Sequence, residues 1–273
     1  MSIYPVTVSP LYEGTFSIGT DAIMKPIRPD EPTEKGALKV SINPFLISTP
    51  DRNILIDTGL GPFGPHDHYD IMAKHLADHG LSEYDITDIF LSHLHYDHIG
   101  GLAHRQNGYW ELTFPDACIY THQTEWEENL EKYGNQDEYP LLAEFLNFVD
   151  ARADFKFVAD GDRPIPEINI QVINGHTPYS LGIWFAYEDY KYVMAGDVIG
   201  SSSAVNRKFA AKYDHDGKQS MKMREELTKR AWKEGYMFLF YHATENPIVR
   251  FDDYDDRKGY VIKPVQYENS TQK

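Results

Sequence analysis

Residues 92–101, SHLHYDHIGG, place four groups that could bind a metal within six positions: His93, His95, Asp97 and His98. Desolvating so many polar groups together is costly unless they bind something, so the segment predicts a metal site. If the extended conformation continues, side chains 93, 95 and 97 share one side, because side chains alternate along a strand. His98 then needs a turn, which Gly100 and Gly101 permit. Two groups of ligands could thus face two adjacent ions.

Residues of the same types follow other strand-like runs. Five runs each end in a His or Asp: NILI in Asp57, DIFLS in His93, INIQVI in the segment of His176, KYVMAG in Asp197 and YMFLFY in His242. Side chains at strand ends are held by a rigid sheet yet project into the loops where ligands bind. This pattern therefore indicates a site built at the ends of several strands.

Composition limits the class of protein. A net charge of −16 would repel phosphate backbones, so no nucleic-acid partner is expected. The chain contains no run of 18 apolar residues, and its start lacks the features of a secretory signal, so we expect a cytoplasmic protein with no membrane partner. The single cysteine, Cys118, excludes a thiolate cluster and is expected in the core. Any metal must therefore be held by nitrogen and oxygen.

The hydrophobic pattern predicts an α/β protein that forms one domain over residues 1–273. Strand-like runs are expected at 6–12, 37–49, 53–57, 88–93, 117–121, 168–173, 182–187, 191–197 and 236–242. Helices are expected at 68–80, 122–134, 141–153 and 218–235, several of them closing at glycine. The mixture suggests layered sheets covered by helices.

The motifs resemble the metallo-β-lactamase superfamily from about residue 37 to 262. They are HxHxDH at 93–98, GHTP with His176, AGD with Asp197, a late His242 and DTG with Asp57. The resemblance implies an αββα sandwich of two packed mixed β-sheets flanked by helices, with a dinuclear metal site. It implies one ion on His93, His95 and His176, a second on Asp97, His98 and His242, and Asp197 as the bridge. Asp57 matches a carboxylate that orients a ligand, and a simple turn-forming Asp is the alternative.

The chemistry implied is hydrolysis by a hydroxide shared between two Zn²⁺ ions, for which Fe or Mn could substitute. Asp97 could orient that hydroxide or pass a proton to the leaving group. Many zinc β-lactamases carry cysteine where this chain has Asp197, so antibiotic hydrolysis is not expected. Only 31 residues follow His242, which argues against a glutathione thioester. The chain looks closest to lactonase-like enzymes, which open cyclic esters, although Gly200 replaces their tyrosine.

Several alternatives stay open. Persulfide dioxygenases share the motif but use one iron; thioesterases and phosphodiesterases belong to the same superfamily, and a metal site could also serve binding without turnover. Tyr179, in HTPYSLG, could supply a hydroxyl or simply pack. The loop 59–70, which carries Phe63, is expected to form a wall of the substrate pocket, with a plain connection as the alternative. The expected partner is a small-molecule substrate, and the oligomeric state is left open, with a homodimer as one option.

Overall fold

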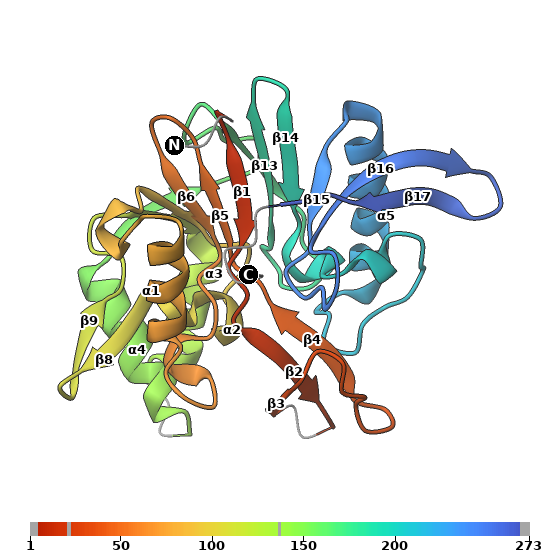
Figure 1. The fold of residues 1–273 in the computed structure, drawn as a ribbon. Helices are drawn as coiled ribbons and strands as arrows, with labels where there is room; N and C mark the ends of the chain where they lie inside the picture. Colours follow the sequence, from red (N-terminus) through yellow and green to blue (C-terminus); the bar gives the residue numbers. More distant parts are fainter. Residues whose placement is uncertain (1–4, 21–22, 136–137, 268–273) are drawn as a thin grey trace. The chain divides into compact units, whose positions relative to one another are not determined.

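The computed structural model describes residues 5–20, 23–135 and 138–267, and it divides the chain into two compact units (Figure 1). The first unit runs to Phe157, and the second covers Val158–Tyr267. Each unit contains one six-stranded sheet with helices packed on it. The mixed α/β class is therefore confirmed, while the expected single domain stays a prediction.

The main sheet of the first unit has the strand order β1-β5-β6-β7-β10-β11. Its strands are β1 (Thr7–Pro10), β5 (Phe45–Ser48), β6 (Asn53–Ile56), β7 (Asp88–Phe90), β10 (Cys118–His122) and β11 (Asp154–Val158). Two smaller sheets join β2 (Gly14–Ile18) to β3 (Met24–Ile27) and β4 (Leu38–Ile42), and β8 (Ala103–Gln106) to β9 (Tyr109–Leu112). The helices are α1 (Tyr69–Asp78), α2 (Tyr96–Ile99), α3 (Gln123–Tyr133) and α4 (Pro140–Arg152), with 3-10 turns η1 (Gly61–Phe63), η2 (Glu83–Asp85) and η3 (Gly100–Leu102).

The sheet of the second unit has the strand order β12-β13-β14-β15-β16-β17. Its strands are β12 (Ile168–Val172), β13 (Leu181–Tyr187), β14 (Tyr190–Met194), β15 (Met237–Leu239), β16 (Ile248–Asp255) and β17 (Gly259–Pro264). The 3-10 turns η4 (Gly196–Ile199) and η5 (Ser202–Ala204) follow β14, and α5 (Gly217–Glu234) packs on the sheet. Met223, Leu227 and Ala231 of α5 belong to the same buried cluster as Val193 and Phe238.

The parallel pairing of strands determines where the loops that carry the candidate site residues begin. In the first unit β6 and β7 are parallel, with Ile56 opposite Phe90, so the chain leaves both strands at one edge. In the second unit β14 and β15 are parallel, with Met194 opposite Leu239. The segments of Asp57 and His93, and those of Asp197 and His242, therefore start side by side within their units.

The four expected helices are confirmed as α1, α3, α4 and α5 within about two residues at each end. The run 37–49 is instead two strands, which break at Asn43 and Pro44 because proline has no N–H to donate. The strands β2, β3, β8, β9, β11, β16 and β17 were not expected.

One local prediction is wrong. The extended conformation does not continue through Asp97: His95 is the last extended residue, with φ −68° and ψ 148°, and α2 begins at Tyr96. The amide of His98 donates to the carbonyl of His95 at 2.9 Å, which closes this turn. The ligands at 93, 95 and 97 are therefore arranged by a strand end followed by a helical turn.

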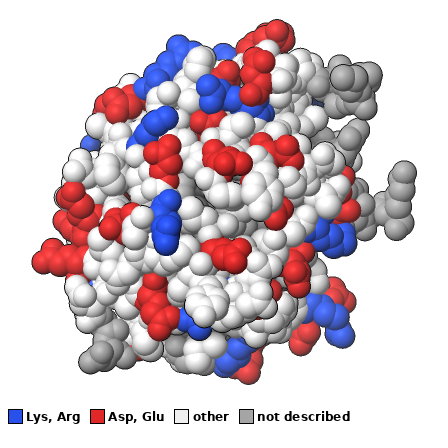
Figure 2. Space-filling view, turned by 90° about the vertical axis from the view of Figure 1, so that its left-hand side faces the viewer, with Lys and Arg blue, Asp and Glu red and all other residues white. Residues whose placement is uncertain are grey.

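Two surface properties bear on partners. On the face drawn in Figure 2, acidic and basic side chains are interspersed, with no broad area of Lys and Arg among the residues described there. Within the described chain, every helix is too short or too polar to cross a bilayer. The absence of a nucleic-acid partner stays a prediction.

Candidate metal centre

In the first unit, His98 is fixed by the segment that follows β6. Asp57, which is 0% exposed, accepts a hydrogen bond from His98 Nδ1 at 2.7 Å through Oδ2. The same carboxylate accepts from the amide and the hydroxyl of Ser92, both at 2.7 Å. Thr58 donates its amide (2.7 Å) and hydroxyl (3.0 Å) to the carbonyl of His98. Because Nδ1 carries the proton, the lone pair of His98 is on Nε2.

The two glycines after His98 are required by close packing of this segment. A Cβ on Gly101 would lie 1.9 Å from the carbonyl oxygen of Thr58, and one on Gly100 would lie 2.0 Å from that of Leu60. Side chains at either position would push the 57–60 segment away from His98. The GG of SHLHYDHIGG is thus explained by backbone contact.

The other ligands of the first unit converge beside His98. His93 Nε2 lies 3.0 Å from His95 Nδ1, and the ring centroids of His93 and His98 are 4.0 Å apart. Asp97 Oδ2 lies 3.7 Å from His98 Nε2. Burial, and then the charge of Asp97, raise the pKa of Tyr96 to about 12, so its phenol stays protonated at neutral pH. All four predicted ligands of this unit therefore gather in one cluster.

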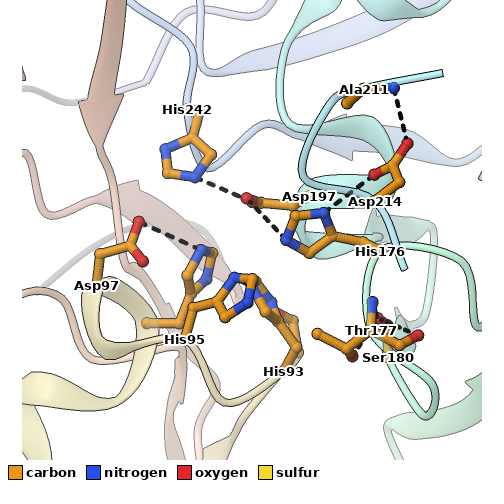
Figure 3. Close-up of polar contacts among 12 residues, drawn as sticks. His93, His95, Asp97, His176, Thr177, Ser180, Asp197, Ala211, Asp214 and His242 are labelled. Atoms are coloured by element: carbon orange, nitrogen blue, oxygen red, sulfur yellow. Dashed lines mark hydrogen bonds and ion pairs between the residues drawn. The ribbon is translucent and has the colours of Figure 1, made fainter. Parts of the chain in front are cut away.

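In the second unit, Asp197 lies between two imidazoles (Figure 3). Its Oδ2 is 3.4 Å from His176 Nε2, and its Oδ1 is 2.9 Å from His242 Nε2. The side chains of Asp197 and His242 are 18% and 12% exposed, so solvent reaches them. His242 is anchored through its amide, which donates to the carbonyl of Gly200 at 2.8 Å. The three predicted ligands of this unit also form one cluster.

Asp214 is a residue of this site that sequence reasoning missed. Its side chain is fully buried, and its Oδ1 accepts from His176 Nδ1 at 3.1 Å (Figure 3). Burial works to raise the pKa of Asp214, but the bonds from His176 and from the amide of Ala211 outweigh it and leave the pKa lowered. Asp214 therefore does for His176 what Asp57 does for His98.

Sequence reasoning also did not single out two further acidic residues of the first unit, Glu125 and Glu13. Glu125 of α3, 4% exposed, accepts from the amide of Leu94 at 3.3 Å and so supports the loop between His93 and His95. Glu13 accepts from the amide of Leu60 at 2.9 Å and lies 3.0 Å from His68 Nδ1. Burial raises the pKa of Glu13, against the opposing effect of its bond with His68.

The loop 59–70 makes contacts through two of its side chains, His68 and Phe63. His68 is buried and hydrogen-bonded to Glu13. Phe63 lies with its ring centroid 5.1 Å from that of Phe145 and 6.0 Å from that of Tyr96. Its role as a wall of a substrate pocket stays a prediction. Cys118 is buried, as expected.

The donor atoms of both clusters fit a divalent metal ion. Imidazole nitrogens and carboxylate oxygens are ligands suited to Zn²⁺, and those of Asp97 and His98, or of His176 and Asp197, lie within 4.8 Å of one another. The buried carboxylates of Asp57 and Asp214 accept hydrogen bonds from Nδ1 of His98 and of His176, respectively. In both histidines Nε2 then faces another acidic side chain. This is the arrangement in which a histidine can coordinate a cation.

Comparison with known proteins agrees with this chemistry. The family model of the metallo-beta-lactamase superfamily matches residues 38–231. A hydroxyacylglutathione hydrolase of Haemophilus ducreyi is 28% identical over 131 residues, a match that covers 47% of this chain and 42% of that protein. The chain thus spans less than half the length of this curated relative.

Solved structures share the fold over nearly the whole chain. A probable metal-dependent hydrolase from Staphylococcus aureus has 22% identity and a TM-score of 0.73, covering 97% of this chain and all of that one. AidC, a dizinc quorum-quenching lactonase, has 21% identity and a TM-score of 0.75, covering 98% and 97%. The hydrolase AbOPH has 23% identity and a TM-score of 0.77, with the same coverage. With the family model matched over more than half of its length, the chain belongs to the metallo-β-lactamase superfamily.

Proposed function

We propose that the protein is a dizinc hydrolase that opens ester or lactone substrates. The two clusters would contribute to one centre, with one ion on His93, His95 and His176 and the other on Asp97, His98 and His242. Asp197 would bridge the ions. The observation that carries the proposal is the Asp197 carboxylate, whose two oxygens lie 3.4 and 2.9 Å from nitrogens of two different imidazoles. A carboxylate shared in this way suits two neighbouring cations.

The side chains around the ligands would set their protonation. Asp57 and Asp214 each hold the Nδ1 proton of a histidine, so that Nε2 can act as the donor atom. When bound, a pair of zinc ions supplies a water with a pKa lowered toward about 7 and a Lewis acid for the substrate carbonyl. Binding of metal would also release protons from ligands that are protonated in its absence.

Asp97 would handle the proton of the reaction. Water adds to the carbonyl carbon of the ester, and the bond from that carbon to the alkoxide oxygen breaks. An oxygen of Asp97 would accept the proton lost by the water and return it to the leaving oxygen, which leaves a carboxylic acid and an alcohol. For a lactone both groups stay in one hydroxy acid. Asp97 is 6% exposed, a degree of burial that favours direct transfer over exchange with bulk water.

Two substrate classes are supported by relatives. The structural similarity to AidC, described as a dizinc lactonase in complex with N-hexanoyl-L-homoserine as product, supports a lactone. The match to hydroxyacylglutathione hydrolase supports a thioester as the second candidate. In the hydrolysis of a lactone and of a thioester, water adds to a carbonyl carbon. The two reactions differ in the leaving atom, which is oxygen for the lactone and sulfur for the thioester.

A pH-indicator screen of zinc-loaded protein tests the proposal. The panel contains lactones, aryl esters, thioesters and phosphodiesters, with chelator-treated protein and Asp97→Asn as controls. We expect acid release to be fastest with lactones or esters and to vanish in both controls. Turnover of thioesters alone would select the second candidate, and oxygen uptake with one bound iron would refute hydrolysis.

A further inference from the structure

Helix α5 carries a buried arginine that contacts the loops of the second-unit cluster. Arg224 is 3% exposed. Its Nε donates to the carbonyl of Val198 at 2.9 Å, and its Nη1 donates to the carbonyl of Phe209 at 2.8 Å. Its guanidinium carbon lies 4.3 Å from the centroid of the Phe209 ring. A guanidinium is costly to bury, so its position between two loop carbonyls calls for an explanation.

The two carbonyls belong to segments that present acidic residues of the site. Val198 directly follows Asp197 in η4, and Phe209 lies in the stretch that leads from η5 to Asp214. Burial lowers the pKa of Arg224, while the negative charge of Asp214 acts in the opposite direction and favours the guanidinium. One cation therefore links the loop of Asp197 to the segment that orients His176.

The same face of α5 also contacts the loop of His176. Asp216, the N-cap of the helix, donates its amide to the carbonyl of Gly175 at 2.8 Å. One turn later, Ser220 lies so close that a Cβ on Gly175 would be 2.7 Å from its hydroxyl oxygen. Positions 216, 220 and 224 recur every fourth residue, so they share one helix face. This face packs against the backbone beside His176 and beside Asp197.

We propose that Arg224 is a positioning residue of the metal centre, which fixes the Asp197 carboxylate relative to the His176–Asp214 pair. The inference rests on the proposed zinc binding. Arginine suits the task because its Nε–H and Nη–H groups point in fixed, separate directions and can reach two carbonyls at once. A lysine at this position would keep the charge but serve one carbonyl at a time.

The test compares Arg224→Met and Arg224→Lys with a matched control on the same helix, Arg230→Met. The Arg230 guanidinium lies 3.8 Å from the Trp184 ring centroid and bonds to Gln171 and Glu234. Zinc affinity is measured by competition with a chromogenic chelator, and the thermal unfolding of each metal-free protein is recorded. We expect Arg224→Met to weaken zinc binding about 10- to 100-fold, Arg224→Lys to be intermediate and Arg230→Met to bind as the wild type.

The outcomes separate positioning from general stability. A purely structural role would lower the melting temperature of the Met variants at 224 and 230 and leave zinc affinity of the folded proteins unchanged, which would overturn the inference. If Arg224→Met fails to fold, Arg224→Lys decides, and wild-type affinity in that variant refutes it. Wild-type protein that binds no zinc would refute the proposed function, whereas zinc binding indifferent to residue 224 refutes only the role of Arg224.

Discussion

The substitution Asp57→Asn tests how the orienting carboxylate controls metal binding. Asparagine keeps the shape of the side chain, and its carbonyl oxygen can still accept from the amide of Ser92, as Oδ1 does now at 2.7 Å. The amide nitrogen then takes the place of Oδ2 and faces Nδ1 of His98, 2.7 Å away. Two donors cannot share this contact, so the imidazole must move its proton to Nε2. That proton occupies the lone pair needed for a cation.

The expected magnitude follows from the kind of hydrogen bond that the substitution removes. Replacing a carboxylate that orients a metal-bound histidine typically costs 10- to 100-fold in metal affinity, or about 1.4 to 2.7 kcal/mol. The His98 side chain is 0% exposed, so water cannot take the place of the carboxylate oxygen. We therefore expect zinc affinity at the site of His98 to fall within this range.

Asp88→Asn is the matched control. Asp88 is 2% exposed and accepts hydrogen bonds from Arg52, Thr87 and Tyr120 at the other end of β7. Chelator competition gives zinc affinity, and nitrogen-15 spectra of the imidazoles report which nitrogen of His98 is protonated. We expect only Asp57→Asn to lose affinity and to show the Nε2–H tautomer. Wild-type affinity with an unchanged tautomer would refute the reasoning, as would an equal loss in Asp88→Asn.

Three other predictions follow from the same structure. The variant Asp197→Ala should lose metal and lower kcat at least 100-fold, because both imidazole contacts of the carboxylate disappear. Metal analysis together with kinetics measures both effects, and near-normal turnover would contradict the prediction. Phe63→Ala should change KM across a panel of lactones if the loop 59–70 lines the pocket, and unchanged kinetics would exclude that role. Burial raises the pKa of Cys118 above its usual 9.0, so its thiolate fraction at pH 8 lies below that of the unfolded chain. A thiol reagent should therefore react slowly with Cys118 in the folded protein and fast in denaturant. Equal rates in the two conditions would contradict this.

The sequence predicted those elements whose pattern is set by burial. Helix α5 was foreseen because its apolar residues recur at helical spacing and Gly235 ends it in the left-handed conformation, with φ 75°. Strand β16 was missed because its second half, with Asp252, Asp253 and Asp255, is exposed and reads as a loop. A hairpin held mainly by its own ladder has little hydrophobic signature.

The gathering of the candidate ligand residues was predictable because strand ends and residue types coincide in the sequence. Asp214 was not, because it lies 38 residues from His176 in a polar stretch, and only folding brings the two together. The burial of Arg224 was not predicted either, since a charged residue on an amphipathic helix is normally expected to be solvent-exposed. Contacts between distant loops are therefore what the sequence pattern leaves out.

The position of zinc in the folded protein tests the central proposal most directly. Anomalous diffraction from crystals of zinc-loaded protein should show two peaks roughly 3.5 to 4 Å apart. The proposal predicts that both peaks are surrounded by the seven His and Asp ligands, with Asp197 between them. A single peak, no peak, or zinc bound away from these residues would contradict the dizinc assignment.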